Sequence, residues 1–436
     1  MLSKKELLLL CLVSDFCYGE FVIPQVTLEA YTPAGFRASI PADKNTELFA
    51  FHGKLNKEIS QIEYGDFNGD VKVAKNGYFT YYNPNLKLSE DDVVHYWFFV
   101  QNNQLGYRKD GQKWRVTELL PEPGSGCQVS VTKVSDKTNV CKDKVVFEDS
   151  FTEALNEEKW TLEQYMPGYP DFEFVLYKKD PDVTFFKDGK LHIKPKLRED
   201  KEALMTMENI SVELGDGCTR PANCGNRTYL IKNPVVSGRL ETKITFTYGE
   251  FEVKAKVPSG DWLYPEIYLE DSQGKRILIA YTRGNKQLTG NAGDDLGNSL
   301  LFGGPVSNHK EPARSSKLSS YLHNAPLSQS SHTYKLRWTP GDIQLFFDGK
   351  RYGNINTEPD FTGSNPSTFK LVLGVGAGGL HDFPDGYKSN GDYVKPWINY
   401  KATQVSDFYH SRSSWYPSWS TEGRQLEVEY VKVTAI

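Results

Sequence analysis

Three absences narrow what this chain can be. After its first twenty residues the sequence has no apolar run close to the roughly 20 residues that a membrane-spanning helix needs. It also has no basic run, and its net charge is −5, which argues against nucleic acid or an anionic membrane and favours a neutral partner. Methionine is scarce, with 4 residues, whereas 25 Tyr, 24 Phe, 36 Gly and 23 Pro favour strands and turns over long helices.

The chain begins with the features of a secretory signal. Lys4 and Lys5 form a basic start, Leu7 to Val13 an apolar run, and the segment closes near Gly19. We therefore expect residues 1–19 to be removed and the mature protein to be secreted and extracellular. Two of the six cysteines leave with this segment.

The remaining cysteines predict disulfides. The simplest of three possible pairings joins Cys127 to Cys141 and Cys218 to Cys224. Zinc is the alternative, but the pairs lack the tight spacing of zinc knuckles and no His lies close to either, and export favours disulfides. Glycosylation sequons begin at Asn209 and Asn226.

Turn residues divide the chain into many short strand-like runs, which predicts an all-β fold. The runs expected before residue 121 are Gln25–Ala30, Gly35–Ile40, Glu47–Leu55, Gly77–Tyr82, Val93–Val100 and Lys113–Leu119, with tight hairpins at Lys75–Gly77 and Lys109–Gly111. We predict an immunoglobulin-like β-sandwich over 20–121, a linker over 122–144, and a larger concanavalin-like jelly-roll sandwich over 145–436.

Several ordered motifs of the larger segment carry a family resemblance. They are Gly260–Ile267, Arg283–Asn285, His332–Tyr334, Trp338–Pro340, the Asp348–Gly349 turn, Gly378–Pro384 and Lys395–Trp397. This part resembles the laminarinase-type branch of glycoside hydrolase family 16. With the amino-terminal sandwich before it, the whole resembles the insect β-1,3-glucan recognition proteins, also called Gram-negative bacteria-binding proteins.

Active members of that hydrolase family carry three carboxylates on the strand before the Arg-Gly-Asn. Alternation along the strand, with a bulge for the extra step, brings them to one cleft. Retaining hydrolysis needs a nucleophile and an acid/base about 5–5.5 Å apart. Here the resemblance aligns the three positions with Arg276, Leu278 and Tyr281. None is a carboxylate, so we predict that the domain is not an enzyme.

Two other carboxylates are conceivable replacements. Glu266 and Glu270 lie four residues apart and would share a face of a regular strand. The simpler interpretation is that Glu270 begins a polar loop and Glu266 lines the old cleft, together with Trp262, Tyr264 and Trp397. For each of these aromatics, and for Trp415 and Trp419 near the end of the chain, the alternative interpretation is that the ring packs in the hydrophobic core.

The amino-terminal sandwich resembles the family 39 carbohydrate-binding module of the recognition proteins. We predict Phe79 and Tyr81 as aromatic contacts to glucan, since flat rings stack on the apolar faces of sugars. Relatives often carry Trp where Phe79 stands. Asp66, Asp70 and Arg108 are candidate hydrogen-bonding neighbours, with simple surface charge as the alternative.

The resemblance implies a haemolymph pattern-recognition protein that binds fungal or bacterial β-1,3-glucan and activates a serine-protease cascade leading to prophenoloxidase or Toll. Ligand-induced self-association is part of this expectation. A secreted β-1,3-glucanase and a lectin for lipopolysaccharide or lipoteichoic acid are the alternatives. No cofactor and no metal site are predicted, because no loop has the oxygen ligands of a calcium site.

Overall fold

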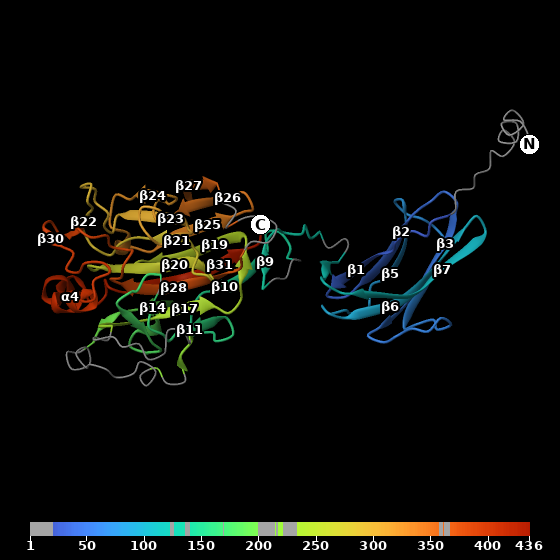
Figure 1. The fold of residues 1–436 in the computed structure, drawn as a ribbon, viewed down its shortest axis with the longest axis horizontal. Coiled ribbons are helices and arrows are strands. Elements are labelled where there is room, and N and C mark those ends of the chain that lie inside the picture. Colours follow the sequence, from blue (N-terminus) through green and yellow to red (C-terminus); the bar gives the residue numbers. More distant parts are fainter. Residues whose placement is uncertain are drawn as a thin grey trace, which may run out of the picture. The chain divides into compact units, whose positions relative to one another are not determined.

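The computed structural model describes residues 21–122, 126–135, 140–168, 170–198, 214, 217–220, 233–356, 361 and 367–436. The chain divides into two compact units, Met1–Cys127 and Gln128–Ile436, which are described separately (Figure 1). The predicted signal segment, Asn209, Asn226 and Cys224 lie outside the described residues. In the described part of the chain, no helix is long and apolar enough to cross a membrane.

The first unit is a sandwich of two four-stranded sheets. Its strands are β1 (Thr27–Thr32), β2 (Phe36–Pro41), β3 (Thr46–Leu55), β4 (Phe67–Val71), β5 (Tyr78–Asn83), β6 (Val93–Asn102), β7 (Leu105–Arg115) and β8 (Leu120–Pro121). One sheet has the order β5-β2-β1-β8 and the other β4-β3-β6-β7. The sequence forms them by alternation: along β6, Val94, Tyr96, Phe98 and Val100 point into the core between the sheets.

The turns of this unit are only partly as predicted. The hairpin at Lys75–Gly77 is confirmed, with positive φ at Asn76 and Gly77. The prediction of a second hairpin at Lys109–Gly111 is wrong, because strand β7 continues through these residues. They form a bulge-like irregularity in β7, where the register with β6 shifts between Tyr96 and Phe98. The chain turns earlier instead, at Asn103 and Gln104, which both have positive φ.

The larger unit stacks two large sheets, so the predicted all-β fold of two sandwiches is confirmed. The first sheet contains β10 (Val145–Asp149), β13 (Thr184–Lys187), β14 (Lys190–Ile193), β19 (Gly249–Lys256), β25 (His332–Trp338), β26 (Asp342–Phe347), β27 (Lys350–Asn356) and β31 (Leu426–Thr434). The second contains β9 (Lys133–Val134), β11 (Trp160–Leu162), β17 (Arg239–Thr242), β18 (Phe246–Thr247), β20 (Leu263–Asp271), β21 (Arg276–Tyr281), β23 (Leu300–Val306), β24 (Ser319–Leu322) and β28 (Phe369–Ala377).

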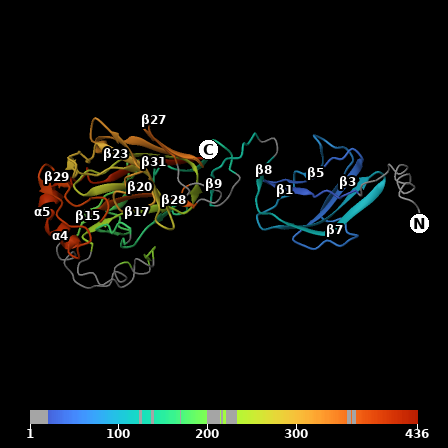
Figure 2. The ribbon, with the colours of Figure 1, turned by 45° about the horizontal axis from the view of Figure 1, so that its top comes forward.

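Smaller elements complete this unit. Two three-stranded sheets comprise β12 (Val175–Tyr177), β15 (Lys196–Leu197) and β16 (Val235–Ser237), and β22 (Leu288–Thr289), β29 (Lys388–Ser389) and β30 (Tyr393–Val394). The short helices are η3 (Leu327–Gln329), α4 (Gln404–His410), α5 (Arg412–Trp415) and η4 (Tyr416–Ser418). Figure 2 shows α4 and α5 together at one end of the unit.

The two large sheets differ in how they are covered. In β19 buried residues alternate with half-buried ones, so one face of its sheet is open to solvent. Every residue of β20 and β21 is buried, which means that loops cover the face of their sheet that points away from the core.

The segment predicted as a linker belongs largely to the larger unit. β9 pairs with β18, and the backbone amides of Val131 and Asp143 donate to the carbonyls of Ile436 and Ala435. The structural boundary therefore lies at Cys127 and not at residue 144. Polar composition suggested a loop, but these pairings satisfy its backbone in the way a strand would.

The three cysteines that the structure describes, Cys127, Cys141 and Cys218, are each disulfide-bonded. Their sulfur atoms are therefore not available as zinc ligands. The predicted disulfide state of these residues is confirmed.

Candidate functional sites

The first candidate site is the outer face of the sheet β4-β3-β6-β7. Trp97 of β6 lies between His52 of β3 and Arg108 of β7. The His52 and Trp97 rings are stacked with centroids 3.7 Å apart, and the Arg108 guanidinium carbon lies 3.8 Å from the Trp97 ring centre. The Trp97 indole N–H donates to the carbonyl of Glu63, so the ring is fixed in orientation.

Polar groups surround this stack, and the cluster of His52, Trp97, Arg108, Asp70 and Tyr64 is called the aromatic face below. Arg108 pairs with Asp110 at 2.7 Å and keeps 36% of its side chain exposed. Asp70 is exposed too. The pKa of His52 is lowered, mainly because the imidazole is partly buried. Two nearby charges act in opposite directions: the Asp70 carboxylate raises this pKa and the Arg108 guanidinium lowers it. Tyr64 is 73% exposed, with its ring 5.7 Å from that of His52.

The structure separates the predicted glucan contacts. Asp70 and Arg108 belong to the aromatic face, and Asp66 lies at its edge, near Lys54 of β3. Phe79 and Tyr81 lie on β5 of the opposite sheet and point inward. Phe79 is 3% exposed, and the Tyr81 ring stacks on Phe51 in the core. The prediction that Phe79 and Tyr81 stack on sugar is therefore wrong.

Sequence reasoning missed His52 and Trp97. Both lie within runs that were predicted only as strands, and the pairing of β3 with β6 brings them together on the solvent side. The alternation within β6 was the available signal, because Trp97 falls between the inward-pointing Tyr96 and Phe98.

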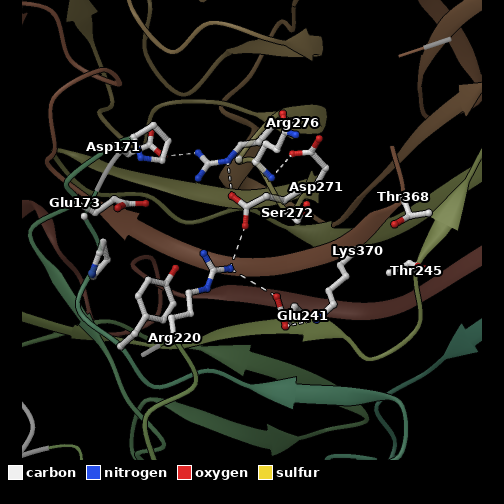
Figure 3. A pocket seen from close by; sticks show the side chains of 17 residues that line it. Asp171, Glu173, Arg220, Glu241, Thr245, Asp271, Ser272, Arg276, Thr368 and Lys370 are labelled. Atoms are coloured by element: carbon white, nitrogen blue, oxygen red, sulfur yellow. Dashed lines mark hydrogen bonds and ion pairs between the residues drawn. The ribbon is translucent and has the colours of Figure 1, made fainter. Parts of the chain in front are cut away.

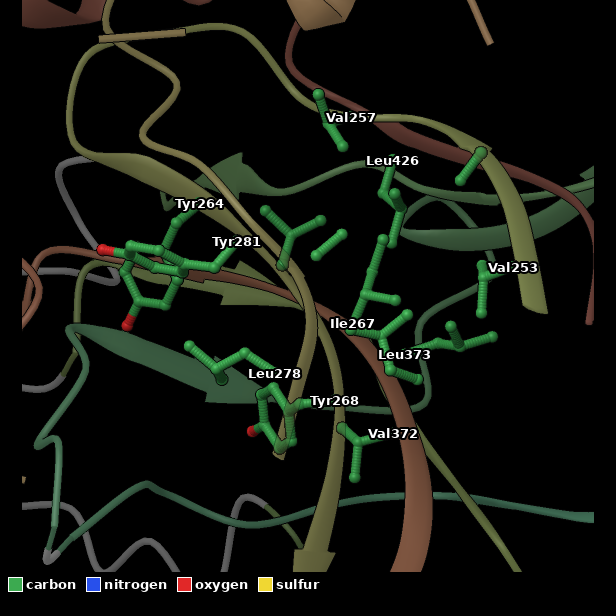
Figure 4. Packing of buried hydrophobic residues seen from close by; sticks show 14 of the residues in the cluster. Val253, Val257, Tyr264, Ile267, Tyr268, Leu278, Tyr281, Val372, Leu373 and Leu426 are labelled. Atoms are coloured by element: carbon green, nitrogen blue, oxygen red, sulfur yellow. The ribbon is translucent and has the colours of Figure 1, made fainter. Parts of the chain in front are cut away.

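The second candidate site is the covered face of β20 and β21. Tyr264, Glu266, Tyr268 and Glu270 alternate along β20 and share this face. On β21 the register shifts between Leu278 and Tyr281, as the family pattern requires. Arg276 lies 4.5 Å from the Tyr268 ring, and the Tyr281 and Tyr264 rings are 6.1 Å apart (Figure 4). The three aligned positions thus face the same region.

Ion pairs fill that region. Glu270 accepts from Arg276 at 2.9 Å and from Arg220 at 3.0 Å (Figure 3), and also from Arg239 at 2.6 Å. Burial alone would raise the pKa of Glu270, but the three guanidiniums hold it well below its usual value. Glu270 is therefore an ionised structural carboxylate.

Glu266 is also occupied, since its carboxylate accepts hydrogen bonds from Tyr177 at 3.0 Å and from Tyr268 at 3.2 Å. Burial raises its pKa above the ordinary range. Glu266 and Glu270 do share a face, as the replacement hypothesis required. Both are nevertheless buried, at 1% and 7% exposure, and held by Arg239, which leaves no open pair of carboxylates for a sugar.

A chain of charges crosses this face from the loops above it. Arg276 pairs with Asp171 at 2.5 Å, Asp171 with Arg314 at 3.3 Å, and Arg314 with Asp382 at 2.6 Å. Sequence reasoning missed Asp171, Arg239 and Arg314, because their partners lie on segments remote in the chain. No local spacing signals such a network.

The structure places the predicted cleft aromatics in the core. Trp262, Tyr264 and Trp397 are 0%, 4% and 1% exposed, and the Trp397 indole N–H donates to the carbonyl of Gly379. Trp415 and Trp419 are buried too. For these rings the core interpretation is confirmed, and in this structure they present no surface to a sugar.

Cavities remain on either side of the charge chain. One of about 460 Å³ is lined by Glu173, Arg220, Arg276 and Lys370, among others (Figure 3). Burial raises the pKa of Glu173 well above its usual value, and the nearby charges of Asp171 and Glu266 raise it further. A second cavity, of about 350 Å³, adjoins Tyr281 and Arg283.

Fold and sites together define a carbohydrate-binding sandwich joined to a larger jelly-roll unit, and comparisons with known proteins agree. A family model described as "Carbohydrate binding domain (family 32)", CBM39, matches residues 22–140. The beta-1,3-glucan-binding protein of Hyphantria cunea is 35% identical over 98% of this chain and 98% of its own length. Beta-1,3-glucan-binding protein 1 of Manduca sexta is 33% identical, over 95% and 96%.

This chain belongs to the beta-1,3-glucan-binding protein family. Gram-negative bacteria-binding protein 3 of Drosophila melanogaster is a further relative, 29% identical over 95% of each chain. These relatives are named as binding proteins and not as hydrolases. Among solved structures, the laminarinase from Rhodothermus marinus is 18% identical and matches 67% of this chain and 97% of its own, with a TM-score of 0.45.

Proposed function

We propose that this protein is a secreted recognition protein that binds microbial β-1,3-glucan through the aromatic face and does not hydrolyse it. One observation carries the proposal: Trp97 is held between His52 and Arg108 on a solvent-facing sheet, with Asp70 beside them. Sugar-binding sites combine an aromatic side chain, which contacts the apolar C–H groups, with polar side chains that hydrogen-bond to the hydroxyls. The carbohydrate-binding match and the relatives' names support the same ligand.

The charge network supports binding without hydrolysis. A retaining mechanism needs one free carboxylate as nucleophile and a second as acid/base. Glu270 and Asp171 are each held by two or more arginines, and Glu266 by Arg239 and two tyrosine hydroxyls. Arg276 and Tyr281, at the aligned positions, cannot replace them at neutral pH.

The binding proposal is tested by titrating laminarin into the full-length protein and by sedimenting the protein with curdlan. Arg108→Ala and Asp70→Asn change exposed side chains, so we expect intact folding and at least about a tenfold loss of affinity for each, as is usual for hydrogen bonds to charged groups. Tyr82→Ala, an exposed aromatic on the opposite sheet, is the matched control and should bind like the wild type. Failure of the wild type to bind either glucan would refute the proposal, as would a loss confined to Tyr82→Ala.

The same samples test for hydrolysis and signalling. We expect no release of reducing ends from laminarin by the wild type; release at ordinary glucanase rates would contradict the non-catalytic role. We further propose that glucan-bound protein self-associates and activates a serine-protease cascade. Light scattering with and without laminarin checks the first step. Amidase and phenoloxidase activity in insect plasma after adding the wild type, but not Arg108→Ala, checks the second.

A further inference from the structure

The cavity of about 350 Å³ in the larger unit contains a cation with an unusual environment. Arg283, at 5% exposure, lines it together with Tyr281, Phe302 and Tyr387. The guanidinium carbon of Arg283 lies 5.5, 5.7 and 5.6 Å from the centres of those three rings. The cation is thus held by aromatic side chains at the wall of a cavity.

Among the residues that the structure describes, Arg283 makes one side-chain hydrogen bond, so most of its N–H donors have no partner there. Its Nε donates to the backbone carbonyl of Asp382 at 2.7 Å. Within the described ranges, no carboxylate forms an ion pair with it, whereas the neighbouring Arg314 pairs with both Asp171 and Asp382. A buried guanidinium has five N–H donors and is strongly favoured when a carboxylate or phosphate accepts from two of them at once.

The other walls fit a sugar ring. Tyr281 is 5% exposed, and its buried hydroxyl lies beside the Asp382 carboxylate. The remaining lining combines apolar side chains such as Pro312, Pro384 and Leu318 with Arg314, whose charge is paired with Asp171 and Asp382. Asp294 and Glu311 also line the cavity and are exposed. The cavity volume lies near the lower limit for small-molecule sites, so it suits a monosaccharide unit and not a polymer strand.

We propose that this cavity, called the arginine pocket below, binds a glycan residue that carries an anionic group, with the anion on Arg283 and the sugar ring against Tyr281 and Tyr387. The shared chemistry is a carboxylate or phosphate attached to a hexose. The rim carboxylates Asp294 and Glu311 disfavour additional negative charge, so a single carboxylate should bind more tightly than a doubly charged phosphate. The site is independent of the aromatic face and would give the protein a second, acidic class of ligand.

The test uses the full-length protein and three probes: D-glucuronate, glucose 6-phosphate and D-glucose. Saturation-transfer NMR and calorimetric titration should detect glucuronate binding, weaker glucose 6-phosphate binding and no binding of glucose. Arg283→Met should weaken glucuronate binding at least about tenfold, and Tyr281→Phe, which removes only the hydroxyl, a few-fold. Arg337→Met makes the same change at an exposed position of β25 and should leave binding unchanged.

Laminarin binding, measured on each variant, reports separately on the aromatic face and on folding of the first unit. A thermal unfolding curve of each variant reports on the larger unit. Equal affinity for glucose and glucuronate would overturn the proposal, as would full glucuronate binding by Arg283→Met or no binding of either anion by the wild type. If Arg283→Met does not fold, Tyr281→Phe and Arg283→Lys, which keeps the charge but loses the planar fork, give the same decision through reduced affinity.

Discussion

Glu173 is a buried carboxyl group with acidic neighbours, and it makes the stability of the fold depend on pH. Burial, then the charges of Asp171 and Glu266, raise its pKa far above the ordinary value near 4.3. In the unfolded chain Glu173 loses its proton near that ordinary value, whereas in the folded chain it keeps the proton to a higher pH. Between the two pKa values the folded state binds more protons, so stability falls as pH rises.

This predicts a pH-dependent effect of Glu173→Gln, which is isosteric with the protonated acid. We expect the variant and the wild type to be equally stable near pH 4, and the variant to be more stable at pH 8 by at least about 1 kcal/mol of unfolding free energy. Urea denaturation at pH 4, 6 and 8 measures the difference. Glu157→Gln, at an exposed glutamate, is the control and should show no such trend. A constant difference at all three pH values would contradict a raised pKa of Glu173.

At the scale of elements, β5 shows how alternation decides which aromatics can reach a ligand. Tyr78 and Tyr82 point to solvent, with 50% and 38% exposure, while Phe79 packs in the core. Phe79→Ala should therefore cost about 3–5 kcal/mol of folding free energy, and Tyr78→Ala only about 0.5 kcal/mol. Chemical denaturation of the two variants checks this. Glucan affinity per folded molecule should be unchanged in both; a selective loss of affinity in Phe79→Ala would show that Phe79 contacts sugar after all.

The fold could be predicted further than the sites could. Turn residues and alternation located strands β1, β2, β3, β5 and β6, because these signals are local. β4 was missed, since Phe67-Asn-Gly-Asp-Val has the composition of a turn, and its strand state depends on pairing with β3. Family motifs located Arg276, Leu278 and Tyr281 on one face.

The partners of these residues could not be predicted. Asp171, Arg239 and Arg314 reach the same face from segments separated by tens of residues. Buried charges must be paired, and this requirement brings the three residues together. The spacing of residues along the sequence carries no sign of it. The stack of His52, Trp97 and Arg108 is likewise a product of three strands in register.

At the scale of the whole molecule, the two units have separate hydrophobic cores, and no described residue belongs to both. We therefore expect residues 20–122 alone to fold and to retain the laminarin affinity of the full-length protein. Their urea midpoint should match the transition of the first unit in the full chain, followed by Tyr fluorescence and circular dichroism. Matched affinity with a shifted midpoint would show energetic coupling between the units, and loss of binding would show that the larger unit contributes to the glucan site.

The segment that enters the larger unit is attached to both of its sheets. β9 pairs with β18 of one sheet, and Val131 and Asp143 hydrogen-bond to residues that directly follow β31 of the other. A mechanical load applied to the chain at Cys127 would therefore be shared between two sheets. Rupture would require breaking both attachments, so this entry point should resist the stepwise peeling that detaches a single edge strand.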